Sequence, residues 1–535
     1  MANADLNGAL NSILSSGTME GTLIDGGYIV QIVYFEGNNW DGVEMNVTIE
    51  NGVVNGEADL WGDLWPVTGR VQGSSILLTM TDSADPAETS ELIRIAGDVG
   101  LMGSVAGMYT RVGIGYADIN SGMFVASFMP EGGFDPDGVA NVVSSIYSGS
   151  KHIIFRDIFE EEYKLGWGEL HINIDPTGTV TADDTTIWLD GGSDPDDVNF
   201  THPNAAPMNL GFVQGELIET SDEIKTNIIY LEFYDSVNDR TLGLYQAVGS
   251  RRGIFVIEGD IFMTGDAYMA TGEGLAPSLD VNTDYDIKVA AAHAGMLGQS
   301  RSAWIGPGAN QMPYSSSFTT PALFDNTDPD FSGNLLKIYN GSLIAFKNDD
   351  DNSWLNNGFD NPDSNGEPDF IRLVELYETG ALQGEEIMGG SVGELELENP
   401  LSYYPATFVG FVNKQGEGAP SASGTLNFLA RVLYSAAVFS EGAGDGYMNA
   451  YMTGTLSFSE SSATLSYTDP SGSSETASLT AENAEGLLHM HGALDDRTYL
   501  DIFWPVGGKK AVYITSNNTT GDGLIIEVGE AYLTR

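Results

Sequence analysis

The densest group of oxygen-bearing side chains lies between Asp349 and Asp369. Calcium takes about six to eight oxygen ligands, and Asp or Asn at alternate positions around a glycine turn can wrap such an ion. Residues 361–369 have that pattern, although Arg372 stands where a loop of this kind would supply a bidentate Glu. The pattern predicts a Ca²⁺ site, with a solvated acidic loop as the alternative. The candidate ligands are Asp349, Asp351, Asp360, Asp363, Asn365, Glu367 and Asp369.

A second group with possible metal chemistry is His489-Met490-His491. If this segment is extended, residues two apart point to the same side, so the two imidazoles share one face of a strand. Such a pair can bind a transition metal. The sequence does not fix a third ligand, though Asp495 and Asp496 are near. Histidines that bind no metal are the simpler interpretation.

Three carboxylates recur at alternate positions in Glu394, Glu396 and Glu398. The segment resembles the acidic strand of laminarinase-type jelly-roll glycoside hydrolases, over five residues and with Glu396 where that family usually has Asp. The resemblance implies a nucleophile and an acid/base on one strand face. Retaining hydrolysis needs the two carboxyl groups about 5 Å apart with divergent pKa values. A solvent-facing strand explains the same alternation, and we favour it.

Other catalytic patterns are missing from the sequence. Cysteine does not occur, and no Gly-x-Ser-x-Gly stands in a strand-to-helix context. The glycine-rich stretch 442–446 lacks the Lys-Ser/Thr of a phosphate-binding loop. We therefore expect a protein that is not an enzyme, with glycoside hydrolysis as the weak alternative.

Tryptophans gather in the first half of the chain, at Trp40, Trp61, Trp65, Trp167 and Trp188. Exposed aromatic rings beside Asp and Asn suit the stacking of a sugar ring, whereas buried ones fill β-domain cores or close barrel ends. A carbohydrate or a small apolar molecule is therefore a possible ligand.

The charge of the chain excludes several partners. Asp and Glu number 76 against 21 Lys and Arg, which gives a formal net charge of -55 over 535 residues. Such a field repels nucleic-acid phosphates and anionic lipid. Hydrophobic residues make up 42% of the chain, too many for an acidic disordered tail. No apolar stretch reaches the length of a membrane-spanning helix, and residues 1–17 lack the basic start of a secretory signal.

The sequence predicts that short strands position these groups. Apolar residues alternate at period two, as in Gly27 to Phe35, Glu44 to Ile49, Ile76 to Met80 and Thr498 to Phe503, with Gly, Asn and Asp between strands. The expected fold is mainly β, with tandem antiparallel β-barrel or β-sandwich domains and a few short connecting helices. The alternation does not choose between barrel and sandwich.

Three stripes at helical spacing predict the connecting helices. They run through Leu6 to Leu14, from Pro136 to Tyr147, and from Ile287 to Ala294. Their spacing suggests helix-then-sheet units in tandem. The expected division is a β domain with an N-terminal helix at 1–134, a β domain with a leading helix at 135–283, a loop-rich acidic β domain at 284–415 and a β domain resembling the first at 416–535.

Internal similarity supports this repeat. Gly69–Asp82 aligns with Gly454–Asp469 across a two-residue gap, and Gly-Thr-Leu occurs at both 21–23 and 424–426. The stretch 228–233 looks like a weaker copy.

These features favour a non-enzymatic, extracellular or cell-surface structural protein. We expect this protein to self-associate and to depend on cations. The alternative is a soluble extracytoplasmic, for example periplasmic, binding protein with a small molecule or carbohydrate in a barrel or between domains. Nucleic acid and a membrane span are not expected among its partners.

Overall fold

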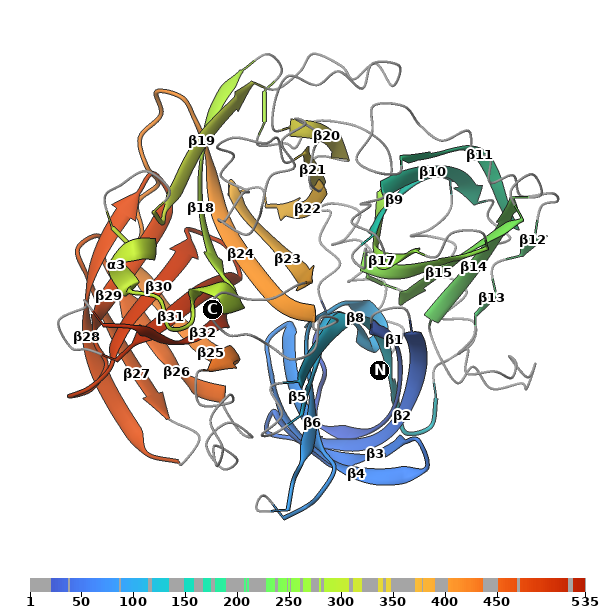
Figure 1. Cartoon of the computed structure of the whole chain (residues 1–535), viewed down its shortest axis with the longest axis horizontal. Coiled ribbons are helices and arrows are strands. Elements are labelled where there is room, and N and C mark those ends of the chain that lie inside the picture. The colour runs from blue at the N-terminus through green and yellow to red at the C-terminus, as the bar shows by residue number, and fades with distance from the viewer. Residues whose placement is uncertain are drawn as a thin grey trace. The chain divides into compact units, whose positions relative to one another are not determined.

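The computed structural model consists almost entirely of antiparallel strands (Figure 1). The residues it describes are 21–36, 39–85, 88–113, 118–133, 149–157, 167–174, 179–188, 206–207, 209–210, 228–235, 239–247, 249–250, 252–259, 263–270, 279–280, 283–306, 311–319, 335–339, 343–347, 371–377, 379–389, 403–435, 451–468, 472–517 and 523–534. They divide into two compact units, one of Met1–Val112 with Ile119–Gly272 and one of Gly113–Asp118 with Glu273–Arg535.

The first sheet is a closed barrel of eight strands. Each strand pairs with the next, and β1 also pairs with β8 through contacts such as Tyr28↔Pro130. Closure leaves the barrel without a free edge. The strands are β1 (Gly26–Glu36), β2 (Asn39–Glu50), β3 (Val53–Leu60), β4 (Asp63–Gln72), β5 (Ser75–Thr81), β6 (Glu91–Val99), β7 (Ser104–Gly113) and β8 (Asp118–Pro130), with the 3-10 turn η1 (Leu101–Gly103) before β7.

The interior of this barrel is filled by the inward half of each alternating strand. In β2, Val43, Met45, Val47 and Ile49 are buried, and the residues between them are exposed. Bulky rings add to the same core, including the stacked pair Tyr34 and Tyr109, whose centroids lie 4.5 Å apart. A packed core of this size is the main source of the barrel's stability.

The second sheet has nine strands, two of them very short. Its first and last strands, β9 and β17, pair as β1 and β8 do. The strands are β9 (Gly149–Asp157), β10 (Trp167–Ile174), β11 (Thr179–Trp188), β12 (Ala206–Pro207), β13 (Asn209–Leu210), β14 (Ile228–Asp235), β15 (Arg240–Ala247), β16 (Arg252–Glu258) and β17 (Met263–Ala270).

The third sheet has seven strands, and its first and last strands again pair. The strands are β18 (Asp284–Ala292), β19 (Tyr314–Thr319), β20 (Leu335–Tyr339), β21 (Leu343–Lys347), β22 (Ile371–Leu376), β23 (Ala381–Gly389) and β24 (Tyr403–Lys414). The 3-10 turn η2 (Ala294–Met296) and the single-turn helix α3 (Arg301–Trp304) lie between β18 and β19.

The fourth sheet is a second closed eight-stranded barrel, in which β25 pairs with β32. Its strands are β25 (Gly424–Ser435), β26 (Tyr451–Phe458), β27 (Ser462–Thr468), β28 (Ser474–Ala484), β29 (Leu487–Ala493), β30 (Tyr499–Pro505), β31 (Lys510–Ser516) and β32 (Ile525–Thr534). The four sheets therefore repeat one up-and-down connectivity along the chain, and the prediction of tandem β domains is confirmed. The exact four-domain boundaries remain a prediction.

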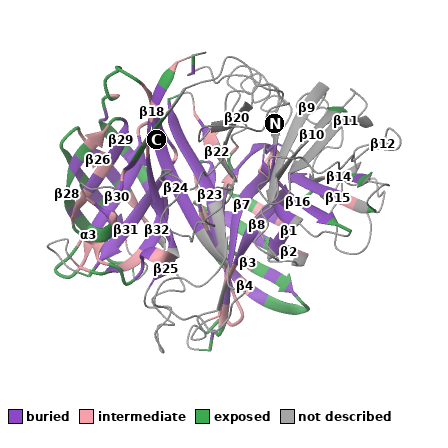
Figure 2. Ribbon diagram, turned by 45° about the horizontal axis from the view of Figure 1, so that its top comes forward, coloured by how far each residue is buried: buried purple, intermediate pink, exposed green. Residues whose placement is uncertain are grey.

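Within the second unit, the third sheet packs on the outer wall of the last barrel. Strands β18 and β24 contact β30, β31 and β32, and buried residues follow these strands (Figure 2). Four charged side chains are enclosed there, since Lys510 pairs with Glu385 of β23 and with Glu530 (3.1 Å), and Arg431 pairs with Glu530 (2.7 Å). Two cations thus balance two anions, as a buried cluster requires.

Two sequence interpretations are wrong. The helix expected from Ile287 to Ala294 is mainly strand β18, in which Ala290, Ala291 and Ala292 are all buried. Because both faces of this stretch are covered, its apolar residues do not alternate strictly and also fit a helical spacing. The stripes at 6–14 and 136–147 lie outside the described residues.

The repeat alignment is out of step by two strands. Gly69–Asp82 covers the end of β4 and β5, the fourth and fifth strands of their barrel, whereas Gly454–Asp469 covers β26 and β27, the second and third of theirs. Hairpins of alternating residues look alike at period two, so one hairpin aligns with another of a different position. The described helices include none long and apolar enough to cross a membrane.

Candidate metal centre

The two histidines of the His-Met-His segment lie on the outer wall of the last barrel. Strand β29 alternates, with Leu488 and Met490 in the barrel core and His489 and His491 between them on the other face. The predicted shared face of the imidazoles is therefore found. The rings stack on each other with centroids 4.7 Å apart.

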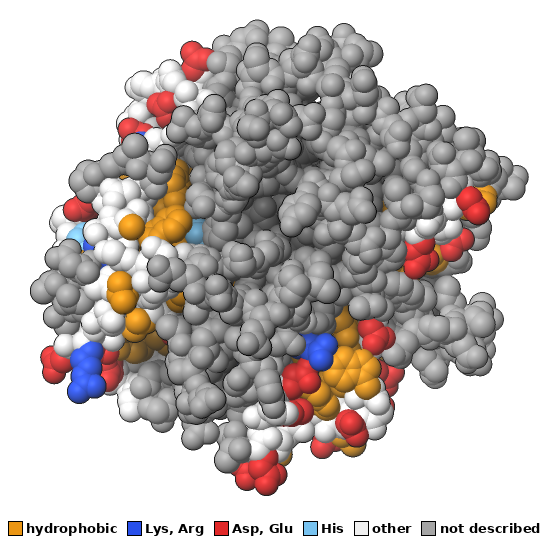
Figure 3. Space-filling view, viewed as in Figure 1, with side chains coloured by type: hydrophobic (Ala, Val, Ile, Leu, Met, Phe, Trp, Pro, Cys, Tyr) orange, Lys and Arg blue, Asp and Glu red, His pale blue; other side chains and the backbone are white. Residues whose placement is uncertain are grey.

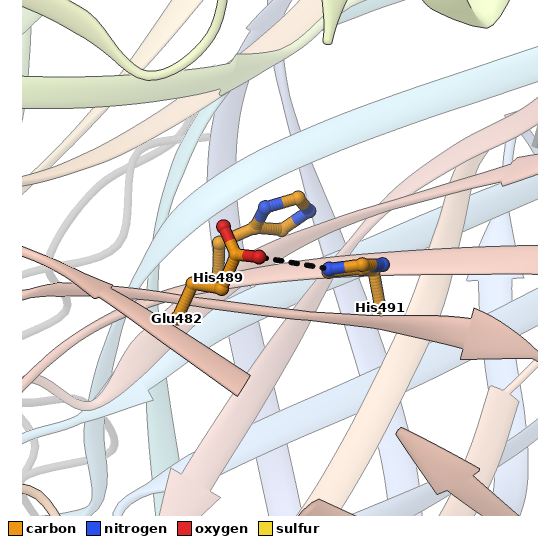
Figure 4. Close-up of side chains that lie close together, drawn as sticks. All are labelled: Glu482, His489 and His491. Atoms are coloured by element: carbon orange, nitrogen blue, oxygen red, sulfur yellow. Dashed lines mark ion pairs between the residues drawn. The ribbon is translucent and has the colours of Figure 1, made fainter. Parts of the chain in front are cut away.

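Glu482 joins the histidines from the neighbouring strand β28. The hairpin register places Glu482 directly opposite His489. Its carboxylate oxygen lies 3.8 Å from His491 Nε2, and one ligand atom from each of the three residues lies within 4.8 Å of the other two. Figure 4 shows the carboxylate beside both rings. These spacings suit one ion held between them after small side-chain rotations.

Asp501 on β30 forms a hydrogen bond with His489. It is fully buried, and its Oδ1 lies 2.7 Å from His489 Nε2. The carboxylate also accepts two hydrogen bonds from Arg301 of α3, from Nε and Nη2, each at 2.6 Å. A carboxylate fixed in this way orients the imidazole, so His489 Nε2 donates to Asp501 and Nδ1 remains to bind a metal.

Tyr499 on β30 forms a hydrogen bond with His491, as Asp501 does with His489. Its hydroxyl lies 2.7 Å from His491 Nδ1, which leaves Nε2 on the side of Glu482. The Arg301 guanidinium covers the Tyr499 ring at 4.8 Å from the centroid. On the far side, Phe503 stacks on His489 at 4.3 Å. Both rings are therefore held in place by neighbours on β30.

Burial and neighbouring groups shift the pKa values of His491 and Asp501. Burial, followed by the neighbouring His489, lowers the pKa of His491 below its ordinary value, so this imidazole is neutral near pH 7. Burial alone would raise the pKa of Asp501, but the hydrogen bonds from Arg301 and His489 outweigh it and hold that pKa below its usual range. A metal ligand must be deprotonated, and the lowered pKa of His491 meets that condition for this residue.

The donor set indicates the kind of metal. Two imidazole nitrogens and one carboxylate suit Zn²⁺, Cu²⁺ or Ni²⁺, whereas Ca²⁺ takes oxygen ligands. Glu482 is 69% exposed and His489 only 12%, so the site opens toward solvent on the Glu482 side. Three protein ligands leave at least one coordination position for water or another group.

Among the described residues, Asp495 was also singled out in the sequence, and it has a different role. Asp495 Oδ1 accepts the backbone N–H groups of Arg497 and Thr498, at 2.6 and 2.8 Å, and so closes the β29–β30 turn. The seven candidate calcium ligands Asp349, Asp351, Asp360, Asp363, Asn365, Glu367 and Asp369 lie outside the described residues, as do Glu394, Glu396 and Glu398.

Sequence reasoning missed Glu482, Asp501 and Arg301. The first had a signal, because a two-residue turn at Glu485-Gly486 sets the register that brings Glu482 opposite His489. Arg301 had none, since it comes from the single-turn helix α3, far from these strands in the sequence. Neither protein-family models nor curated protein sequences match the chain.

Proposed function

We propose that this protein is a non-enzymatic structural protein of tandem β-barrel domains that binds a divalent transition-metal ion on the outer wall of its last barrel. One observation carries the proposal, namely that Glu482, His489 and His491 converge while Asp501 and Arg301 orient the first imidazole. Histidines that bind a metal almost always donate their other ring nitrogen to a carboxylate, a carbonyl or water, and His489 has such a partner in Asp501.

The packed interiors favour a structural role over transport of a ligand inside a barrel. In the last barrel the core contains Phe428, Trp504 and Tyr513 among many smaller apolar residues, and Phe458 meets Trp504 edge-on at 5.0 Å. Carriers of the barrel type need interior volume, and side chains that fill it leave the outer wall for binding.

The net charge also supports a cation-dependent assembly role, which we assign to a cell surface or to the outside of the cell. With a net charge of -55, copies of the chain repel one another until counter-ions reduce the charge. The proposal therefore includes cation-dependent self-association, with the segment from Asp349 to Asp369 as a Ca²⁺ site. Comparing particle size by light scattering in Ca²⁺ and in chelator tests that part, and a size that is unchanged contradicts it.

Zinc titration tests the metal site itself. The full chain is titrated with Zn²⁺ by calorimetry in a large excess of Ca²⁺, which occupies unspecific carboxylates. We expect one tight site, and a loss of affinity of at least about tenfold in His491→Ala. Glu485→Gln is the matched control, because this carboxylate stands on the same hairpin, contacts Lys288 at 3.5 Å and lies outside the cluster. Equal zinc binding by wild type and a His489→Ala/His491→Ala variant would reject the site.

A further inference from the structure

The turn between β3 and β4 holds an unusual residue for its conformation. Leu60 pairs with Asp63, so Trp61 and Gly62 form a two-residue hairpin turn. Their φ angles are +54° and +91°, which is the signature of a type I′ turn. Type I′ turns favour Asn or Gly at the first position, since a bulky side chain is strained at positive φ.

The turn between β2 and β3 of the same barrel has the residues that this backbone geometry usually takes. Asn51 and Gly52 connect β2 and β3 with φ angles of +52° and +73°. The same backbone geometry is thus built by Asn-Gly at one end of the barrel and by Trp-Gly at the other. Backbone strain of this kind gathers at functional sites. Trp61 therefore needs an explanation other than turn formation.

The Trp61 side chain extends over the mouth of the first barrel. Its indole Nε1 donates to Asp41 of β2 (3.3 Å), and its ring meets Trp65 of β4 edge-on at 5.9 Å. The guanidinium of Arg111, on β7, lies 5.3 Å from its ring centroid. Strands β5 and β6 separate β4 from β7, so the turn reaches across the barrel end.

This fixed ring remains open to solvent. Trp61 is 56% exposed and the nearby Leu64 is 67% exposed. Hydrophobic side chains gather over this barrel with Asp and Glu side chains around them (Figure 3). The Arg111 guanidinium lies over one face of the indole, and with 56% of the residue exposed much of the ring is still accessible to a ligand. An aromatic ring that is already immobilised loses little entropy on binding.

We propose that Trp61 is a stacking platform for a neutral carbohydrate at the mouth of the first barrel. The flat indole face fits the C–H face of a pyranose ring. Carboxylate oxygens of Asp41, beside the indole, and of Asp59, which accepts the Gly62 N–H at 3.2 Å, are acceptors for sugar hydroxyls at its rim. Neutral sugars are favoured because the chain carries a net charge of -55 and Arg111 is paired with Glu91.

Binding to a panel of oligosaccharides tests the platform. The full chain is titrated by calorimetry and tryptophan fluorescence with cellohexaose, laminarihexaose, xylohexaose, mannohexaose and a heparin-derived hexasaccharide as the anionic arm. At least one neutral hexasaccharide is expected to bind, and Trp61→Ala to weaken it at least tenfold. Leu64→Ala is the matched control, because it removes another exposed apolar side chain near the same turn and is expected to keep the affinity.

Three outcomes would overturn the assignment. They are no binding of any neutral hexasaccharide, equal loss in Trp61→Ala and Leu64→Ala, or tighter binding of the anionic arm. The same titration in chelator separates this inference from the metal site, since the proposed sugar site contains no metal ligand of the last barrel.

A second variant excludes simple misfolding. Trp61→Asn places the residue that a type I′ turn prefers at the strained position, so the midpoint of thermal unfolding is expected to rise while sugar binding is lost. A variant that is more stable and still binds as wild type would reject a role for the ring.

Discussion

The first and last barrels have the same number of strands, the same strand order and the same closure, yet one ion pair of each lies in a different environment. In the first barrel, Arg111 and Glu91 pair at an open end with side chains 35% and 24% exposed. In the last, Lys510 and Glu530 pair at no more than 2% exposure beneath the third sheet. Closure thus gives both barrels the same architecture, while the elements packed against a barrel determine whether the charged side chains on its outer wall are buried.

The buried cluster shows how far the second environment departs from water. Burial would raise the pKa of Glu530, but Arg431 and Lys510 outweigh it and keep that pKa below its ordinary value. Tyr532 donates a further hydrogen bond to Glu530 at 3.1 Å. Each charge there depends on its partners, because none can be hydrated instead.

The largest expected effect comes from removing one of these partners. Lys510→Met leaves Glu385 and Glu530 in excess and is expected to lower the free energy of unfolding by about 3–5 kcal/mol. Arg111→Met in the first barrel is the comparison and should cost only about 0–1 kcal/mol, since exposed pairs contribute little. Denaturant unfolding of both variants measures this. Similar losses would abolish the distinction between the two barrels.

A smaller effect is expected on metal binding. Asp501→Asn removes the negative charge that orients His489, so zinc affinity should fall about 10–100-fold. Asp41→Asn, which alters a carboxylate of the first barrel, should leave zinc affinity unchanged. Competition with a chromogenic zinc chelator gives both values. If Asp501→Asn binds zinc as wild type does, the buried carboxylate has no part in the site.

The pH dependence follows from His491. Its pKa in the folded chain lies below the ordinary 6.5, so it contributes stability that is complete above about pH 6.5 and is lost as the pH falls toward the folded pKa. Zinc affinity falls in the same direction, by up to about tenfold per pH unit for each imidazole that becomes protonated. Calorimetry from about pH 8 to about pH 5, a range that brackets the ordinary pKa of histidine, measures both the stability and the zinc affinity. A pH-independent affinity would mean that zinc is bound elsewhere.

The smallest effect compares two turns of one type. Glu485-Gly486 in the last barrel has φ angles of +55° and +104°, close to those of Trp61-Gly62. Replacing the first residue by Asn should raise the free energy of unfolding by about 1 kcal/mol or less in each turn. Thermal unfolding of Trp61→Asn and Glu485→Asn checks this. A loss of stability in Trp61→Asn alone would show that the ring contributes more by packing than the turn loses by strain.

Sequence reasoning reached the fold because strand alternation is local. Val43, Met45 and Val47 point inward and the polar residues between them outward, as period two requires. It failed at Ala290 to Ala292, where burial on both faces removes the alternation. Barrel and sandwich could not be distinguished, because the deciding contact joins the first strand to the last.

The site was predictable only in part for a similar reason. His489 and His491 share a face through spacing alone, and a hairpin register could have added Glu482. In the sequence Asp501 is one more acidic residue, and its contact with Arg301 of α3 distinguishes it only in the folded chain. Contacts between residues so far apart in the chain leave no periodic trace in the sequence.

Pairing of the first strand with the last also constrains how each closed barrel is made. During synthesis, β25 emerges well before β32, so one edge of β25 has no partner in its own barrel until the final strand is complete. Nearly the whole domain must be present before closure, which makes the step slow and leaves an exposed edge in the meantime. The net charge of the chain, formally -55, opposes contact between two such edges on separate copies by repulsion.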